Sequence, residues 1–83
     1  MTQFMDVHHG AQGITEDQLR EAMKAEAELE EEMGVRFQHV WADPESGTVY
    51  CLTDGPSADA VQRVHERTSG RLPDEIHPVP LSL

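Results

Sequence analysis

Two apolar runs joined by a short turn, VRFQHVWADPESGTVYCLTD at residues 35–54, constrain the fold of this chain more than any other stretch. The Pro, Ser and Gly residues between the runs predict a β-hairpin with its loop at Asp43 to Gly47, so that Ala42 pairs with Thr48. In this register one face carries Phe37, His39, Trp41, Val49, Cys51 and Thr53, and the other carries Gln38, Val40, Tyr50 and Leu52. His39 then faces Cys51, and a slip of one residue would separate them.

The segments that flank the hairpin predict two helices and two further strands. Residues 3–9 read as a strand with Phe4, Asp6 and His8 on one face and Met5, Val7 and His9 on the other. Thr15 to Met33 has the start signature of a helix, with Thr15 as the N-cap and Gly34 as the stop. Ser57 to Ser69 predicts a second helix that Gly70 ends. The prolines within residues 75–83 confine a last strand there to a sheet edge.

The apolar stripe of each predicted helix contains or borders one ionisable side chain. Glu26 lies within the first stripe, at helical spacing from its apolar members Leu19, Ala22, Met23, Leu29 and Met33. His65 lies on the flank of the second stripe, which is Ala60, Val61, Val64 and Thr68. We therefore expect a carboxylate–imidazole contact between Glu26 and His65, which would be either an acid–base site or a satisfied buried pair.

The order β-α-β-β-α-β predicts an α+β fold for residues 1–83, a single ferredoxin-like sandwich domain. Right-handed crossovers place the first and third strands in the middle of a four-stranded antiparallel sheet, with two helices on one face. The other face carries enough apolar side chains, Trp41 or Tyr50 among them, that we expect a homodimer formed by sheet-to-sheet pairing, although strand exchange or edge pairing would also cover this face.

Charge narrows the classes of partner. The chain has 16 acidic and 6 basic side chains and a net charge of −10, which repels nucleic acid and anionic membrane surfaces and favours cations. One cysteine excludes an internal disulfide, the N-terminus lacks the pattern of a signal peptide, and no segment reaches 18 apolar residues. We expect a cytoplasmic protein.

Potential metal ligands are the chemically active residues that the sequence offers, since it has no phosphate-binding glycine loop, serine nucleophile motif or Cys-x-x-Cys pair. Five histidines in an acidic background favour a divalent cation. Asp6 and His8, two apart on one strand face, can reach one ion. A pairing of His39 with Cys51 would favour zinc, although a lone cysteine also serves as a small buried hydrophobe.

Six elements together resemble a known family: MDVHH at residues 5–9, Gly34-Val35, Trp41, the run Tyr50-Cys51-Leu52, Pro56, and Val64-His65. The chain is similar to the small ferredoxin-like nickel-binding proteins, formerly a domain of unknown function. The resemblance implies a dimeric, cytoplasmic α+β protein that binds Ni²⁺ and related ions such as Zn²⁺ or Co²⁺ and has no established catalytic activity.

Two departures from the family pattern bear on the ligands. The family's first helix often carries His and Asp where this chain has Met23 and Glu26, and another His where this chain has Ser69. Because this chain lacks those family residues, His8, His9 and His39 are stronger candidates for metal ligands than Glu26 and His65. The candidate metal ligands are Asp6, His8, His9, His39, Cys51 and His65.

The leading hypothesis is a nickel buffer or sink, not an enzyme. One alternative is a small dimeric α+β barrel enzyme or small-molecule binding module, with a pocket between sheet and helices that uses Glu26, His65 and Tyr50. The other alternative is an interaction subunit that pairs through its open sheet face.

Overall fold

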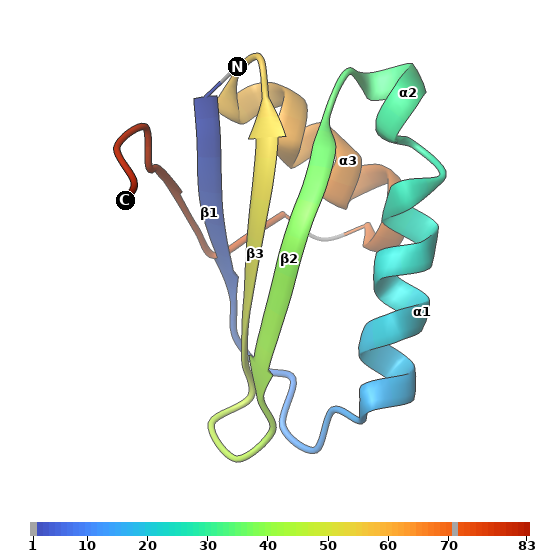
Figure 1. Ribbon diagram of the computed structural model, residues 1–83. Helices are drawn as coiled ribbons and strands as arrows, with labels where there is room; N and C mark the ends of the chain where they lie inside the picture. Colours follow the sequence, from blue (N-terminus) through green and yellow to red (C-terminus); the bar gives the residue numbers. More distant parts are fainter. Residues whose placement is uncertain (1, 71) are drawn as a thin grey trace.

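The computed structural model describes residues 2–70 and 72–83, which form one sheet with its helices on one side (Figure 1). The strands are β1 (Thr2–His8), β2 (Arg36–Asp43), β3 (Thr48–Gly55) and β4 (Glu75–Pro78), and the helices are α1 (Glu16–Ala27), α2 (Glu30–Met33) and α3 (Ala58–Ser69). The α+β class and the antiparallel sheet are confirmed, and the order β2-β3-β1-β4 has β1 and β3 in the middle as predicted. The arrangement is consistent with a ferredoxin-like fold, with three helices in place of the predicted two.

Helix α1 begins at the predicted cap and ends before the predicted stop. The Thr15 side chain accepts a hydrogen bond from the Gln18 N–H at 3.1 Å, and the Gln18 side chain accepts one from the Thr15 N–H at 3.0 Å. The prediction of one helix as far as Met33 is wrong, because the Leu29 N–H bonds to the carbonyl of Glu26, three residues back, at 3.0 Å. This tighter turn separates α1 from α2. Gly34 ends α2 at a φ of 70°, which a glycine adopts without strain.

Helix α3 supplies the centre of the hydrophobic core. Its N-cap is Ser57, whose hydroxyl accepts a hydrogen bond from the Ala60 N–H at 3.2 Å, and Gly70 caps its other end, as predicted. Val61 and Val64 have no exposed surface and pack with Phe4 and Val35. Partly buried residues complete the core: Leu29, Met33, Phe37, Ala58, Ala60 and Ile76.

The hairpin forms, but its predicted register is wrong by one residue. Asp43 pairs with Thr48 and Ala42 with Val49, because the Gly47 N–H bonds to the Asp43 carbonyl at 2.8 Å and closes the turn one residue later than predicted on that strand. Trp41 then lies opposite Tyr50. A β-bulge at Gln38 absorbs the extra residue and restores the predicted pairing of Phe37 with Thr53.

The outer strands differ from prediction at their ends. Strand β1 covers Thr2–His8 where residues 3–9 were predicted, and β4 covers Glu75–Pro78 where the predicted strand continued to Leu83. Pro78 and Pro80 have no N–H to donate, so the ladder cannot continue regularly, although the Val79 N–H reaches the Gln3 carbonyl at 2.8 Å. The predicted position of β4 at a sheet edge is confirmed.

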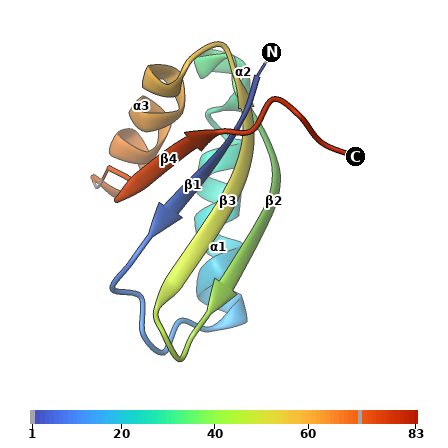
Figure 2. The ribbon, with the colours of Figure 1, turned by 90° about the vertical axis from the view of Figure 1, so that its left-hand side faces the viewer.

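The sheet has one covered and one open face. Figure 2 shows the helices on the same side of the sheet. Directly opposed residues of neighbouring strands share a face, so the pairings of Tyr50 with Val7 and Trp41 put all three on the other side, which we call the open face. Trp41 is 45% and Tyr50 41% exposed there. None of the helices in residues 2–70 and 72–83 is long and apolar enough to cross a membrane.

Candidate metal centre

Two adjacent histidines at the end of β1 point to opposite faces of the sheet. His8 follows the alternation of Phe4 and Asp6 toward the helices. His9, one residue past the strand, lies on the open face, where it contacts Glu75, the partner of Val7. The predicted pairing of Asp6 with His8 is present, with 3.2 Å between Asp6 Oδ1 and His8 Nε2. Each histidine therefore belongs to a different group of polar side chains.

The helix-side cluster consists of Asp6, His8, Glu26, Cys51 and His65. At its centre, His65 Nε2 donates to Asp6 Oδ2 at 2.7 Å and His65 Nδ1 lies 3.1 Å from Glu26 Oε1. The expected contact between Glu26 and His65 is thus confirmed. His65 is 2% exposed, so it lies deeper than the flanking position that the sequence predicted. Both ring nitrogens face carboxylates, which favours the imidazolium form.

Asp6 and His65 each stabilise the ionised form of the other. Burial by itself would lower the pKa of His65, but hydrogen bonds with Asp6 and Glu26 outweigh it and raise the pKa to about 9. Burial would raise the pKa of Asp6, but hydrogen bonds with His65 and His8 hold it below its usual value. The cluster therefore carries a buried carboxylate and a buried imidazolium together.

Cys51 completes a group of three potential metal ligands. One ligand atom each of Asp6, His8 and Cys51 lies within 4.8 Å of the other two. Burial raises the pKa of the Cys51 thiol, and the charges of Asp6 and Glu26 and a hydrogen bond with Asp6 raise it further. The Cys51 thiol is therefore protonated in the metal-free protein, so a metal ion bound through all three side chains would have to displace its proton.

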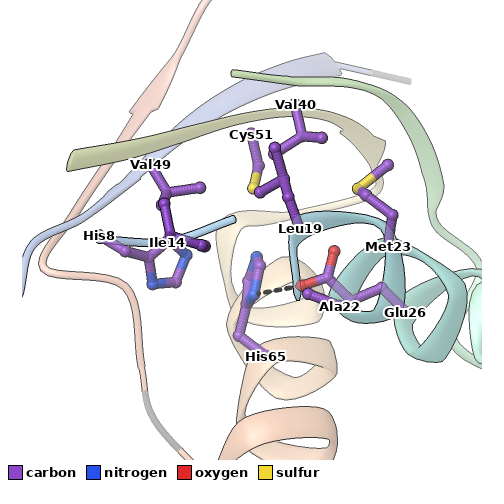
Figure 3. A pocket seen from close by; sticks show the side chains of 10 residues that line it. All are labelled: His8, Ile14, Leu19, Ala22, Met23, Glu26, Val40, Val49, Cys51 and His65. Atoms are coloured by element: carbon purple, nitrogen blue, oxygen red, sulfur yellow. Dashed lines mark ion pairs between the residues drawn. The ribbon is translucent and has the colours of Figure 1, made fainter. Parts of the chain in front are cut away.

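A pocket of about 150 Å³ lies between α1, α3 and the sheet. Figure 3 shows its ten lining side chains: His8, Ile14, Leu19, Ala22, Met23, Glu26, Val40, Val49, Cys51 and His65. Most of them are apolar, and the polar ones belong to the helix-side cluster. Tyr50, which the small-molecule alternative placed in such a pocket, lies on the open face, so that part of the alternative is wrong.

The open-face cluster consists of His9, Glu75 and His77. Glu75 Oε2 lies 3.3 Å from His9 Nε2, and Glu75 Oε1 lies 3.1 Å from His77 Nε2. These hydrogen bonds, with His77 and then His9, lower the pKa of Glu75. All three side chains are about half exposed, at 54% for His9, 49% for Glu75 and 58% for His77. Asp74 fixes the backbone, because its Oδ2 accepts from the His9 N–H at 2.7 Å.

The structure separates the predicted pair His39 and Cys51. His39 lies opposite Leu52 on the open face and Cys51 opposite Val40 on the helix side, as a consequence of the one-residue register error. The ring centroid of His39 lies 4.3 Å from that of Trp41. A site shared by His39 and Cys51 within one chain is therefore excluded.

The sequence did not select Glu75 and His77 as partners of His9. These residues are 66 and 68 positions away from it along the chain and come together because β4 runs antiparallel to β1, with Val7 opposite Glu75 and Met5 opposite His77. The alternation of Glu75 and His77 on a predicted edge strand next to the first strand was the available clue.

Comparison with known proteins identifies the family. The profile of the SCO4226-like proteins, described as nickel responsive, matches residues 4–79. The chain belongs to this family of nickel-responsive proteins. The crystal structure of SCO4226 from Streptomyces coelicolor A3(2) is 59% identical in sequence and superimposes with a TM-score of 0.93, covering 98% of this chain and 99% of that chain. No protein with a curated functional description matches.

Proposed function

We propose that this member of the nickel-responsive family binds divalent transition-metal ions, Ni²⁺ first among them, and acts as a buffer or sink and not as an enzyme. One observation carries the proposal: the adjacent imidazoles of His8 and His9 each lie beside a carboxylate oxygen, 3.2 Å from Asp6 and 3.3 Å from Glu75. Imidazole nitrogen and carboxylate oxygen are donors that suit Ni²⁺, and the family's nickel response agrees with them.

The open-face cluster is the stronger of the two candidate positions. His9, Glu75 and His77 supply two imidazoles and one carboxylate, and their exposure leaves water free to complete an octahedral shell. The low pKa of Glu75 favours the anionic form that a cation requires. Binding here replaces two hydrogen bonds between exposed groups, which contribute little to folding.

The helix-side position has a suitable spacing but a higher cost. Two ligands at right angles around an ion, each at about 2.1 Å, lie about 3 Å apart, close to the 3.2 Å between Asp6 Oδ1 and His8 Nε2. Asp6 has no exposed surface, however, so a hydrated ion must lose water to reach it. The imidazolium of His65 already neutralises part of its charge. We therefore expect a metal ion to occupy the open-face cluster at a lower concentration than the helix-side position.

A homodimer that pairs through the open face is part of the proposal. Trp41 and Tyr50 form a half-exposed aromatic pair there, next to Leu52 and Val7. A stable interface needs about 800 Å² from each partner, so most of the open face would be buried in such a dimer. His39 and the open-face cluster lie on the same face, so they would stand at or near the interface.

A catalytic role for the helix-side cluster has less support. A general base needs a free lone pair within reach of the substrate, and both ring nitrogens of His65 lie against carboxylates in a residue that is 2% exposed. The buried pair is better explained as a structural element.

Titration calorimetry tests metal binding on protein without a polyhistidine tag, with NiCl₂, CoCl₂ and ZnCl₂ in separate runs. We expect heat of binding with Ni²⁺ that a His9→Ala plus His77→Ala variant loses. A His8→Gln variant measures the helix-side contribution, and a His8→Ala plus His39→Ala variant removes two of the three other predicted imidazoles. His39→Ala is the control for a histidine on the same face outside the cluster. No heat with Ni²⁺, or unchanged heat in all of these variants, rules out the proposal.

Light scattering coupled to size-exclusion chromatography tests the dimer. We expect twice the mass of the 9.3 kDa chain, and a shift toward the monomer when Trp41→Glu places a charge in the open face. A monomeric wild-type protein at micromolar concentration contradicts the dimer proposal but does not bear on the metal proposal.

A further inference from the structure

Glu26 has one carboxylate oxygen that the helix-side cluster does not use. Its Oε1 pairs with His65, but Oε2 is buried without a hydrogen-bond partner among the described residues. The residue is 7% exposed. In Figure 3, one oxygen lies on the dashed line to His65 and the other turns away from it, among the side chains that line the pocket. A buried acceptor of this kind is costly unless a donor reaches it.

The space in front of this oxygen is apolar. Leu19 and Met23 of α1 face Val40 and Val49 of the sheet across the pocket of about 150 Å³. A cavity of about that volume in an apolar protein interior holds a molecule the size of benzene, which has six non-hydrogen atoms. Leu19, Met23 and Val40 are partly exposed and Ala22 is exposed, so the pocket has a mouth between α1 and β2.

The negative charge of the helix-side cluster determines which polar group of a bound molecule fits at the bottom of the pocket. The carboxylates of Asp6 and Glu26 share the imidazole of His65, so negative charge gathers at the bottom of the pocket beside the free Glu26 Oε2. An anion would be repelled, and a neutral donor would leave that charge uncompensated. A cationic donor satisfies both the charge and the free oxygen.

We propose that this pocket binds a short aliphatic primary ammonium ion of about six non-hydrogen atoms, with its nitrogen donating to Glu26 Oε2 and its alkyl body between α1 and β2. The site is distinct from the open-face cluster. A metal ion at Asp6 and His8 would oppose the ammonium ion, because it adds positive charge beside the same carboxylates.

Nuclear magnetic resonance titration with isopentylammonium chloride on tag-free protein treated with a chelator tests the proposal. Three matched compounds separate its parts: isopentanol keeps the body and loses the charge, leucine adds a carboxylate to the ammonium, and isovalerate reverses the charge. We expect isopentylammonium to bind at least tenfold more tightly than each of them, with nuclear Overhauser contacts to methyl groups of Leu19 and Val40.

The Glu26→Gln variant supplies the second measurement. It keeps the size of the side chain but removes the charge, so we expect at least tenfold weaker binding, while Glu28→Gln on the exposed side of the same segment leaves binding unchanged. Equal affinity for isopentylammonium and isopentanol, or contacts to Trp41 and Tyr50 on the open face, overturns the proposal. If Glu26→Gln does not fold, the comparison of the four compounds on the wild-type protein decides alone.

Discussion

The buried imidazolium of His65 makes a strong prediction about stability in alkaline solution. In the folded chain its pKa is about 9, against 6.5 in the absence of the fold. Because the folded pKa is the higher one, the folded state holds a proton that the unfolded chain releases between these values. The stabilisation is complete below pH 6.5 and is lost as the pH rises toward 9.

The size of the effect follows from the same two values. One pKa unit corresponds to about 1.4 kcal/mol, so the rise from 6.5 to about 9 is worth about 3 kcal/mol of unfolding free energy. Small domains have only about 5 to 15 kcal/mol in total. The loss corresponds to a fall in melting temperature of about 12 to 24 °C for a chain of this size.

Urea unfolding followed by circular dichroism, on metal-free protein at pH 6, 7.5 and 9, measures this loss. A His77→Asn variant is the control, since it removes an exposed histidine and should show the same fall as the wild-type protein. The low pKa of Asp6 acts only in acid, where stability falls as this carboxylate is protonated. An unfolding free energy that stays constant from pH 6.5 to 9, or a His65 ring that titrates near 6.5 in NMR, refutes the reasoning.

Three further substitutions test the packing and the turns, all by urea unfolding. Thr15→Ala removes the hydroxyl that caps α1 and should cost about 1 kcal/mol, and a cost near zero would contradict the capping box. Val61→Ala deletes two methyl groups from a side chain with no exposed surface and should cost about 2 kcal/mol, more than the same change at partly exposed Val79. Gly47→Ala places a Cβ 2.7 Å from the Gln12 backbone nitrogen at a φ of +76°, so it should cost more than Gly10→Ala, where φ is +85° but the space is open.

The sequence predicted the structure correctly wherever a residue type strongly favours one local conformation. Thr15, Ser57, Gly34 and Gly70 marked helix ends correctly because capping depends on neighbours in the sequence. The break between α1 and α2 carried no such mark: Leu29 and its neighbours are good helix formers, and the tight turn at Glu26 to Leu29 appears only in the hydrogen bonding.

The hairpin register was not predictable to one residue, and the site residues depended on it. The prediction left Asp43 in the loop and paired Ala42 with Thr48, whereas the structure pairs Asp43 with Thr48. This difference of one position moves His39 and Cys51 to opposite faces. Asp6 with His8, and Glu26 with His65, were predicted correctly because each pair needs only strand alternation or helix spacing plus the element order. Glu75 and His77 required the pairing of β4 with β1.

At the bulge, β2 has one residue, Gln38, that is not paired with β3. On either side of it the pairings with β3 run in two ladders that differ by one step, Phe37 with Thr53 and His39 with Leu52. If Gln38 were deleted, these two ladders would join into one regular antiparallel ladder, and Phe37 would remain in the core while Trp41 stayed on the open face. The loss would be the hydrogen bond that Gln38 Nε2 donates to Asp54 Oδ2 at 2.7 Å. A hairpin one residue shorter at this position would therefore present the same two faces.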